Sequence, residues 1–366
     1  MRQPSAASSR PSWRSPAAAV SALLAALVVA LPVRLHAARA DDDDALTPAE
    51  RAAILALGPW PPPPVRDAAN PASGEPGGIA LGEALFYSAR LSPTGLRCAT
   101  CHEPWRHFTD GRPVAQGISP GSRNTPTLLD AARHRHYGWD GAHDQLWQQS
   151  LRPLQDAREM PATDAQVGAL LRRDGPLAVR FEAVFGVAPG ADDARITRAV
   201  GQALAAYVET LASPRTPFDA WRDGLAATAS GEPSASARFA AAARRGLRLF
   251  IGPGGCAGCH AGPTLGDDAF HVSLVHSTTS DGTLDPGRLG ALRNTFRTPA
   301  LRGAATTGPW MHDGSAARLC DAVQPHAADP GDVPPALGAA ERRDLVAFLH
   351  TLAVDAAADD AAECAE

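Results

Sequence analysis

The stretch Gly95–Trp105, GLRCATCHEPW, has two cysteines separated by two residues and a histidine directly after the second cysteine. A zinc site, a redox dithiol or a covalent haem can each begin with this pattern. The pattern returns in Gly252–Pro263, GPGGCAGCHAGP, so the chain carries two copies of it. Any proposed chemistry has to explain both copies.

Covalent haem c accounts for every residue of the pattern. In Cys-x-x-Cys-His the two thiols add across the haem vinyl groups, and the histidine binds the iron. The expected attachment residues of the two haems are Cys98, Cys101 and His102, and Cys256, Cys259 and His260. A zinc site built from two cysteine pairs would need the pairs about 15–20 residues apart, far closer than here, and would leave both histidines without a role.

The N-terminus has the features of a secretory signal peptide. Arginines precede a fifteen-residue apolar run, Ala17–Leu31, and the small-x-small sequence Ala38–Ala40 offers a cleavage site. The run is shorter than the roughly 20 residues that span a bilayer, so an uncleaved anchor is the weaker alternative. We therefore expect residues 1–40 to be removed and the mature protein to lie in the periplasm, where more oxidising conditions suit haem c attachment.

The mature chain, of roughly 325 residues, is longer than one hydrophobic core usually requires, so two domains are expected. The expected parts are a Pro-rich arm over 41–78, a first haem domain over 79–223, a linker over 224–236, a second haem domain over 237–354 and an acidic tail over 355–366. No basic stripe for nucleic acid is expected, since the net charge is -5, and no later span resembles a second membrane segment. Cys320 and Cys364 could pair with each other or stay free.

Helical spacing of apolar residues dominates the chain between these breaks. Asp192–Ser213 and Ala340–Leu352 both follow this spacing, and Pro214 is expected to stop the first helix. No convincing strand-like alternation of polar and apolar residues is present. The expected fold class is therefore mainly α.

The sequences around the two haem motifs repeat. LGEALFYSARLS precedes the first motif and RGLRLFIGPGG the second, while RNTPTL and FRTPAL follow them. Fourteen residues separate Pro126 from Asp140 in the first copy, and fourteen separate Pro299 from Asp313 in the second. We therefore expect two cytochrome-c-like haem domains related by an internal repeat.

Ten short motifs follow one another along Ile79–Leu352. They are LGEALFYSARLS, CATCH, FTDG, RNTPTL, YGWDG, REM, GCAGCH, DPGR, FRTPALRG and PWMHDGS. In this order they resemble the bacterial di-haem cytochrome c peroxidase and MauG family. The resemblance implies a periplasmic, mainly helical enzyme whose first haem reacts with hydrogen peroxide and whose second haem handles electrons. It also implies an electron-donor protein as partner and makes a homodimer possible.

The resemblance assigns four residues near the first haem. Trp139 matches the tryptophan between the haems, whose indole suits electron hopping. Glu159 matches the distal acid that takes a proton from the near oxygen of peroxide and gives it to the leaving oxygen. Gln149 matches the distal glutamine, and Pro153 a proline beside the same haem. Without the family, these residues would be a packed aromatic, a solvated carboxylate, a helix-surface glutamine and a loop proline.

A calcium site at the domain junction is also implied by the resemblance. Its protein ligands would be Asn124 through its side chain and Thr307 and Pro309 through their backbone carbonyls, with waters completing an oxygen shell. Backbone carbonyls leave no mark in a sequence, so this site rests on the family.

Two positions depart from the family pattern, the first of them beside the first haem. In the peroxidases activated by one electron, a histidine in the loop before RNTP caps this haem, and Ile118 stands at that place here. We therefore expect an open sixth position at rest. His107, His134 and His136 are nearby alternatives, although each is more commonly a solvated or structural histidine than a ligand.

The second departure concerns the sixth ligand of the second haem. In the family this ligand lies fourteen positions beyond the histidine of HDG, and it is methionine in the peroxidases or tyrosine in MauG. Counting from His312 leads to His326. Methionine raises the potential of a haem, whereas a second imidazole favours the oxidised iron. Met311 is the alternative ligand.

The predicted function is a di-haem peroxidase that draws electrons from a protein substrate, as MauG does. An ordinary cytochrome c peroxidase with a small donor cytochrome is the alternative within the enzyme class. A di-haem electron carrier without chemistry of its own is the alternative from another class, and a failure to consume peroxide would favour it.

Overall fold

The computed structural model describes residues 46–228, 239–279, 281–291, 293–328, 336–356 and 364. Residues Pro48–Glu366 form one unit, and the expected signal peptide lies outside the described residues. The elements are α2 (Pro48–Ala56), α3 (Pro76–Phe86), α4 (Cys98–Cys101), η1 (Pro104–Arg106), η2 (Ala131–Arg133), α5 (Leu146–Gln155), α6 (Asp164–Arg173), α7 (Gly175–Phe185), α8 (Asp193–Val208), α9 (Pro217–Ala227), α10 (Ala241–Ile251), η3 (Cys256–Gly258), β1 (Phe270–Ser273), β2 (Thr295–Arg297), η4 (Ala304–Thr306), α11 (Leu319–Ala322), β3 (Ala327–Ala328) and α12 (Ala339–His350).

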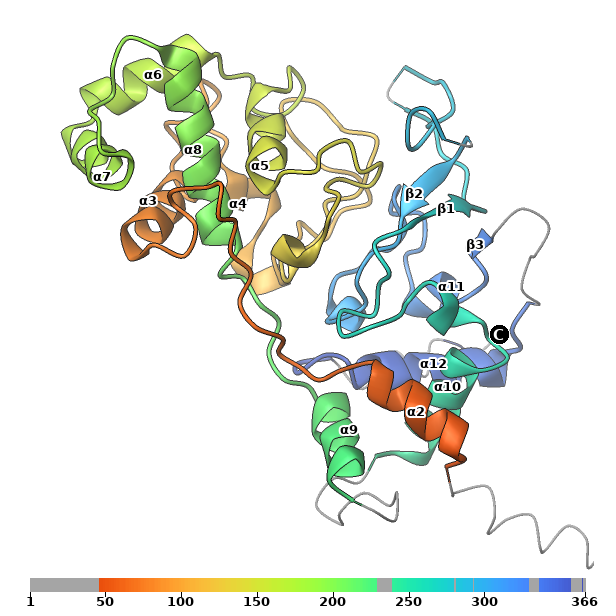
Figure 1. The fold of residues 1–366 in the computed structure, drawn as a ribbon. Helices are drawn as coiled ribbons and strands as arrows, with labels where there is room; N and C mark the ends of the chain where they lie inside the picture. The colour runs from red at the N-terminus through yellow and green to blue at the C-terminus, as the bar shows by residue number, and fades with distance from the viewer. Residues whose placement is uncertain are drawn as a thin grey trace, which may run out of the picture. The chain divides into compact units, whose positions relative to one another are not determined.

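Helix α8 is the centre of the first haem region, the part of the fold that contains the first Cys-x-x-Cys-His motif. Helices α3, α5 and α6 pack on it, and α7 packs on α3 and α6 (Figure 1). Buried apolar side chains, among them Leu81 and Leu85 from α3 and Val200 and Leu204 from α8, form the core between these helices. This core supports α5, which carries Gln149 and Pro153.

Polar residues at the helix ends set the limits of these elements. The Thr163 hydroxyl accepts a hydrogen bond from the Gln166 amide, and the Gln166 side chain accepts one from the Thr163 amide, which makes a capping box at the start of α6. The Asp174 side chain caps α7 by accepting a hydrogen bond from the Leu177 backbone amide, and α7 ends at Gly186, whose φ is 70°.

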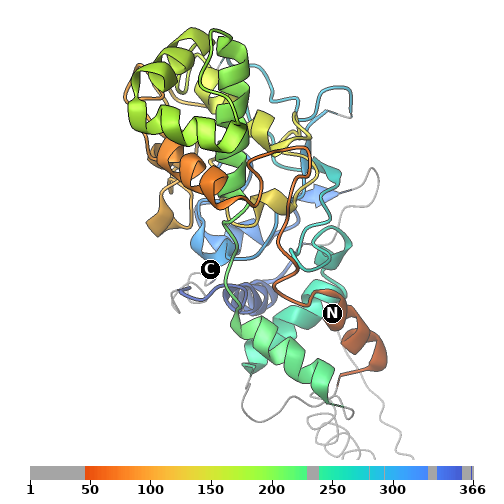
Figure 2. The same ribbon diagram turned by 60° about the vertical axis from the view of Figure 1, so that its left-hand side comes forward.

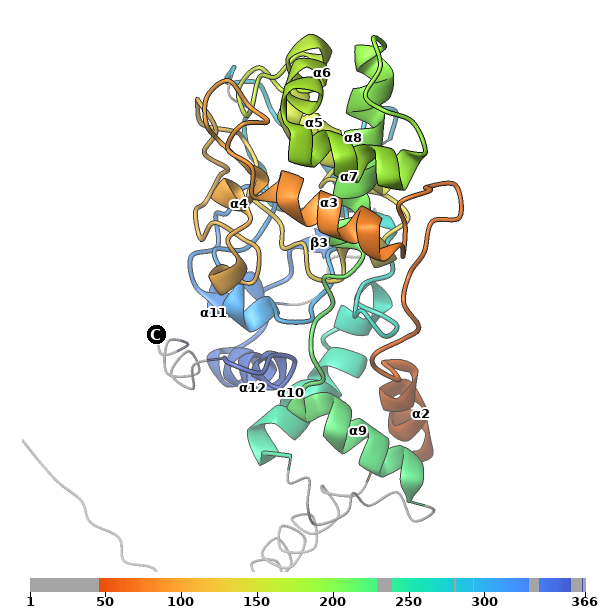
Figure 3. The same cartoon turned by 90° about the vertical axis from the view of Figure 1, so that its left-hand side faces the viewer.

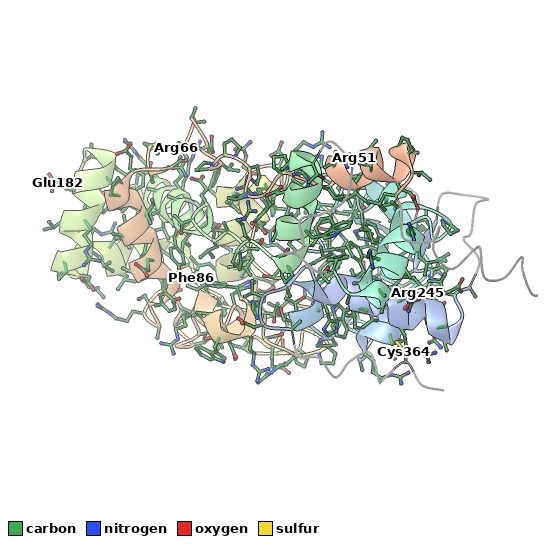
Figure 4. The ribbon with its side chains drawn as sticks, turned by 90° about the horizontal axis from the view of Figure 1, so that it is seen from below. Arg51, Arg66, Phe86, Glu182, Arg245 and Cys364 are labelled. Carbon is green, nitrogen blue, oxygen red and sulfur yellow. A yellow bond between two sulfur atoms is a disulfide. The ribbon has the colours of Figure 1, made fainter. Side chains whose placement is uncertain are left out.

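The second haem region is built on the crossing of α10 with α12 (Figure 3). Helix α11 packs on α12, while α2 packs on α9 and α10, as Figure 2 also shows. A small antiparallel sheet of order β2-β1-β3 lies in the same region, with Phe270 opposite Arg297 and Val272 opposite Ala328. Cys320 of α11 forms a disulfide with Cys364. Figure 4 draws sulfur in yellow and labels Cys364.

The mainly helical class is confirmed, but some expected boundaries differ. The helix expected over Asp192–Ser213 ends at Val208, well before Pro214. The start of the expected linker is helical, since α9 continues to Ala227, and residues 229–238 lie outside the described part. Three short strands were missed, because strands of two to four residues are too short to show alternation.

The expected Pro-rich arm is partly helical. It contains α2, which opens with Pro48 and has Glu50 in its first turn, a favourable start for a helix. Most of the expected acidic tail lies outside the described residues. No helix within the described ranges is both long and apolar enough to cross a membrane.

Candidate functional site

The first Cys-x-x-Cys-His motif forms a single turn of helix, α4, that presents His102. The His102 amide donates to the Cys98 carbonyl at 2.9 Å, and Nδ1 of the His102 ring lies 2.9 Å from the Phe108 carbonyl oxygen. Because a carbonyl can only accept, Nδ1 carries the proton and Nε2 keeps its lone pair for a metal. Burial lowers the pKa of His102, which favours this neutral form.

The second motif repeats this local geometry. The His260 amide donates to the Cys256 carbonyl at 2.8 Å, and Nδ1 of His260 lies 3.1 Å from the Leu265 carbonyl oxygen. Burial, with a smaller effect of His326, lowers the pKa of His260 to about 4. Phe108 and Leu265 both have positive φ, at 59° and 53°, so each loop turns its carbonyl back toward its histidine in the same way.

A cavity of about 270 Å³ opens beside the second motif. Both of its cysteines, His260 and His326 line this cavity. The ring centroids of the two histidines are 6.2 Å apart, and Nδ1 of His326 lies 2.9 Å from the Gln324 carbonyl oxygen. Two imidazoles on opposite sides of one metal, with bonds of about 2 Å, have ring centroids roughly 6 Å apart. These residues therefore fit a covalent haem with two histidine ligands. Met311 lines the same cavity.

The expected distal residues of the first haem come from α5 and the segment after it. Oε1 of Gln149 is buried and has no hydrogen-bond partner among the described residues, so this side chain is available to a bound group. Glu159 follows α5 in a turn where the Met160 amide donates to the Pro153 carbonyl at 3.0 Å. Burial raises the pKa of Glu159, and Arg152, 3.2 Å away, acts in the opposite direction.

Glu159 also lies near the attachment cysteine Cys101. Burial, then the carboxylates of Asp110 and Glu159, raise the pKa of the Cys101 thiol to about 11. A cysteine of the attachment pattern and a nearby carboxylate that can carry a proton are groups that a peroxide-reducing haem can use. The residues of the first site therefore fit the group that the motif predicts.

Trp139 is held by both halves of the chain. Its indole N–H donates to the Asn124 carbonyl at 2.9 Å, and its own carbonyl accepts from the Arg297 amide at 2.9 Å. The Trp139 ring lies edge-on to His312, with centroids 6.4 Å apart, and His312 stacks on Phe296 at 3.8 Å. Trp139 also lines the cavity of the second motif.

The three expected calcium ligands, Asn124, Thr307 and Pro309, line this same cavity. The side-chain amide nitrogen of Asn124, Nδ2, donates to the Arg112 carbonyl at 2.8 Å, which leaves the side-chain oxygen for a cation. The donor types fit calcium.

The loop before RNTP has no histidine, and its Ile118 side chain is 53% exposed. Of the nearby histidines, His134 contacts Asp268 at 3.2 Å and His136 packs on Phe270 with centroids 5.3 Å apart. Both are therefore engaged away from the first motif. The sequence left open whether Cys320 and Cys364 pair, and in the structure they form a disulfide. Arg152 was not identified from the sequence, because it lies in no motif.

Two sites of this kind are typical of one class of protein, the di-haem oxidoreductases. The model of the family described as di-haem cytochrome c peroxidase matches residues 76–227. The MauG methylamine utilization protein of Methylorubrum extorquens is 38% identical over 304 residues, which cover 79% of this chain and 81% of that protein. The cytochrome c551 peroxidase of Nitrosomonas europaea is 31% identical over 252 residues, covering 67% of this chain and 71% of the peroxidase.

Two solved structures have the same fold. A MauG-like protein associated with microbial copper homeostasis aligns with a TM-score of 0.67 and 28% identity, over 82% of this chain and 95% of that one. The di-haem peroxidase BthA of Burkholderia thailandensis aligns with a TM-score of 0.64 and 26% identity, over 77% and 87%. The chain belongs to the di-haem cytochrome c peroxidase and MauG family, and it is a haem peroxidase.

Proposed function

We propose that this protein reduces hydrogen peroxide at the motif of Cys98, Cys101 and His102. The haem, when bound, supplies the iron chemistry that splits the O–O bond. Glu159 takes the proton from the near oxygen of peroxide and returns it to the leaving oxygen as water departs. The observation that carries this proposal is the position of Glu159, whose carboxylate acts on the Cys101 thiol of the first motif. The buried Gln149 oxygen, which has no hydrogen-bond partner among the described residues, adds support.

Electrons reach this site from the second motif through Trp139. Support comes from the position of Trp139, which lines the second cavity and is hydrogen-bonded to residues of both halves of the chain. The indole N–H is directed at a backbone carbonyl, which cannot accept its proton. The indole therefore keeps its N–H proton while Trp139 passes electrons. Per peroxide, two electrons and two protons are consumed and two waters form.

His326 as sixth ligand of the second haem favours the MauG-like function, in which a protein substrate is oxidised. The 6.2 Å separation of the rings of His260 and His326 supports this ligand. Bis-histidine ligation lowers the potential relative to histidine and methionine, so electron uptake from a high-potential donor cytochrome is disfavoured. The protein works in the periplasm, carries two haems c and one calcium ion held by Asn124, Thr307 and Pro309, and can form a homodimer.

The test is the Glu159→Gln variant of the holoprotein, with Glu182→Gln on α7 as the control for a lost carboxylate (Figure 4). Loss of a general acid-base group is expected to slow the reaction with peroxide about 10²–10⁴-fold, with haem content unchanged. An unchanged rate in Glu159→Gln rules out this role for Glu159. A wild-type protein that consumes no peroxide in any redox state would establish the electron-carrier alternative.

A further inference from the structure

Three charged side chains, from Arg152, Asp156 and Arg158, lie around Glu159. Arg152 Nη1 lies 3.2 Å from Glu159 Oε1, and Arg152 Nη2 lies 3.8 Å from Asp156 Oδ2. Arg158 contacts Asp156 through its Nε at 3.4 Å and through its amide N–H at 2.8 Å. Asp156 is therefore satisfied mainly by Arg158, which leaves Arg152 as the cation closest to Glu159.

The backbone of this turn is fixed separately from its side chains. The Ser119 amide donates to the Arg158 carbonyl at 3.1 Å. Gly117 packs so closely that a Cβ added there would lie 2.5 Å from the Glu159 Cα. The loop before RNTP thus fixes the backbone position of Glu159, while Arg152 contacts its carboxylate. Arg152 belongs to α5, the helix that also carries Gln149 and Pro153.

The chemistry proposed for Glu159 needs its ionised form, because only a carboxylate can accept the first proton of peroxide. Burial works against that form by raising the pKa of Glu159, and Asp156 adds to this effect. Arg152 and, less strongly, Arg158 oppose it. Glu159 also acts on the Cys101 thiol, which becomes an uncharged thioether once haem is attached.

We propose that Arg152 is a positioning residue that holds the Glu159 carboxylate ionised and in place to accept the proton of peroxide. This inference rests on the role proposed above for Glu159. The side chain of Arg152 is 43% exposed, so its attraction for Glu159 is partly screened by water. Arg152 therefore adjusts the pH at which the site becomes active and does not act as an on-off switch.

The experiment compares Arg152→Gln, Arg152→Lys and Arg180→Gln with the wild-type ferric holoprotein. Arg180 lies on the exposed side of α7 and serves as the control for loss of one positive charge. Two quantities are measured against pH: the rate of reaction with peroxide, and the equilibrium affinity for cyanide followed at the Soret band. Cyanide arrives as neutral HCN and binds as an anion, so its proton must also pass to a nearby base.

Removing Arg152 leaves only the weaker effect of Arg158 to oppose burial, so Glu159 protonates at higher pH. The acid limb of both profiles is expected to move to higher pH in Arg152→Gln. Below the midpoint, rate and affinity should fall about 1.5- to 5-fold, the range for a partly exposed ion pair, while well above the midpoint they should match the wild type. Arg152→Lys should restore most of the profile, and Arg180→Gln should leave it unchanged.

Superposable profiles for Arg152→Gln and the wild type would overturn this inference. The role of Glu159 is judged separately in the Glu159→Gln variant. If that variant loses the acid limb while Arg152→Gln does not move it, only the inference about Arg152 fails. If Glu159→Gln keeps the acid limb, the proton transfer proposed for Glu159 is wrong, and the inference about Arg152 falls with it.

Discussion

Each of the two motif histidines is prepared for a metal by one backbone carbonyl. The pattern Cys-x-x-Cys-His predicted both His102 and His260, since every residue of that pattern has a chemical role. It could not predict the carbonyls of Phe108 and Leu265, because their direction depends on how each loop closes. Both residues that supply these acceptor carbonyls have a left-handed backbone, which their side chains do not favour.

His326 provides the sharpest prediction at the scale of one residue. In His326→Met the second haem should gain a methionine ligand, and its midpoint potential should rise by on the order of 100 mV, since axial ligands set haem potentials over a wide range. Spectroelectrochemical titration of the holoprotein measures this. Met311→Leu is the control, and a potential that moves in Met311→Leu but not in His326→Met would identify Met311 as the ligand.

Each of the two haem regions has a glycine where two of its helices approach most closely. Gly82 of α3 lies so close to α8 that an added Cβ would be 1.9 Å from the Ala203 carbonyl oxygen. Gly246 of α10 lies so close to α12 that an added Cβ would be 1.8 Å from the Asp344 carbonyl oxygen. Both glycines stand at the same place in the repeated sequences LGEALF and RGLRLF.

Gly82→Ala and Gly246→Ala are each expected to destabilise the fold by about 1–3 kcal/mol, the usual cost of overpacking. Gly224→Ala in α9 is the matched control, because an added Cβ there meets nothing within 4 Å. Alanine should make α9 more stable by up to about 1 kcal/mol. Urea unfolding of the holoproteins measures all three, and equal stability of Gly246→Ala and the wild type would contradict the close approach.

Helices were the elements that the sequence predicted best. Apolar spacing over Ala340–Leu352 anticipated α12 at Ala339–His350 to within two residues at each end. Apolar spacing failed at the end of α8, where Leu211 continues the pattern after the helix has stopped at Val208. A periodic pattern shows which face is buried, and it says less about where the backbone leaves the helix.

At the scale of the whole molecule, buried polar contacts connect regions that no motif links. Arg302 and Asp219 form a fully buried ion pair at 2.9 Å, and the Arg302 guanidinium lies 3.8 Å from the Trp60 ring centroid. Trp60 is 1% exposed and donates to the Ser213 carbonyl at 3.0 Å. The sequence suggested a surface arm around Trp60, because a Pro-rich stretch does not reveal which of its residues is buried.

Arg123 makes a second long-range connection, next to Trp139. It contacts Asp285 at 2.8 Å and Asp140 at 2.7 Å. The motifs RNTPTL, YGWDG and DPGR therefore meet in one cluster of charges. The sequence shows the order of these motifs, but the contacts among them depend on long-range folding.

We propose that the first haem is open at rest and works with a bis-histidine second haem through Trp139. The most direct test adds stoichiometric hydrogen peroxide to the fully ferric holoprotein and follows both Soret bands and the EPR spectrum. We expect the ferric protein to react at once, with spectral changes at both haems that persist. A reaction that begins only after one-electron reduction would contradict the claim and would favour a capped peroxidase served by a donor cytochrome.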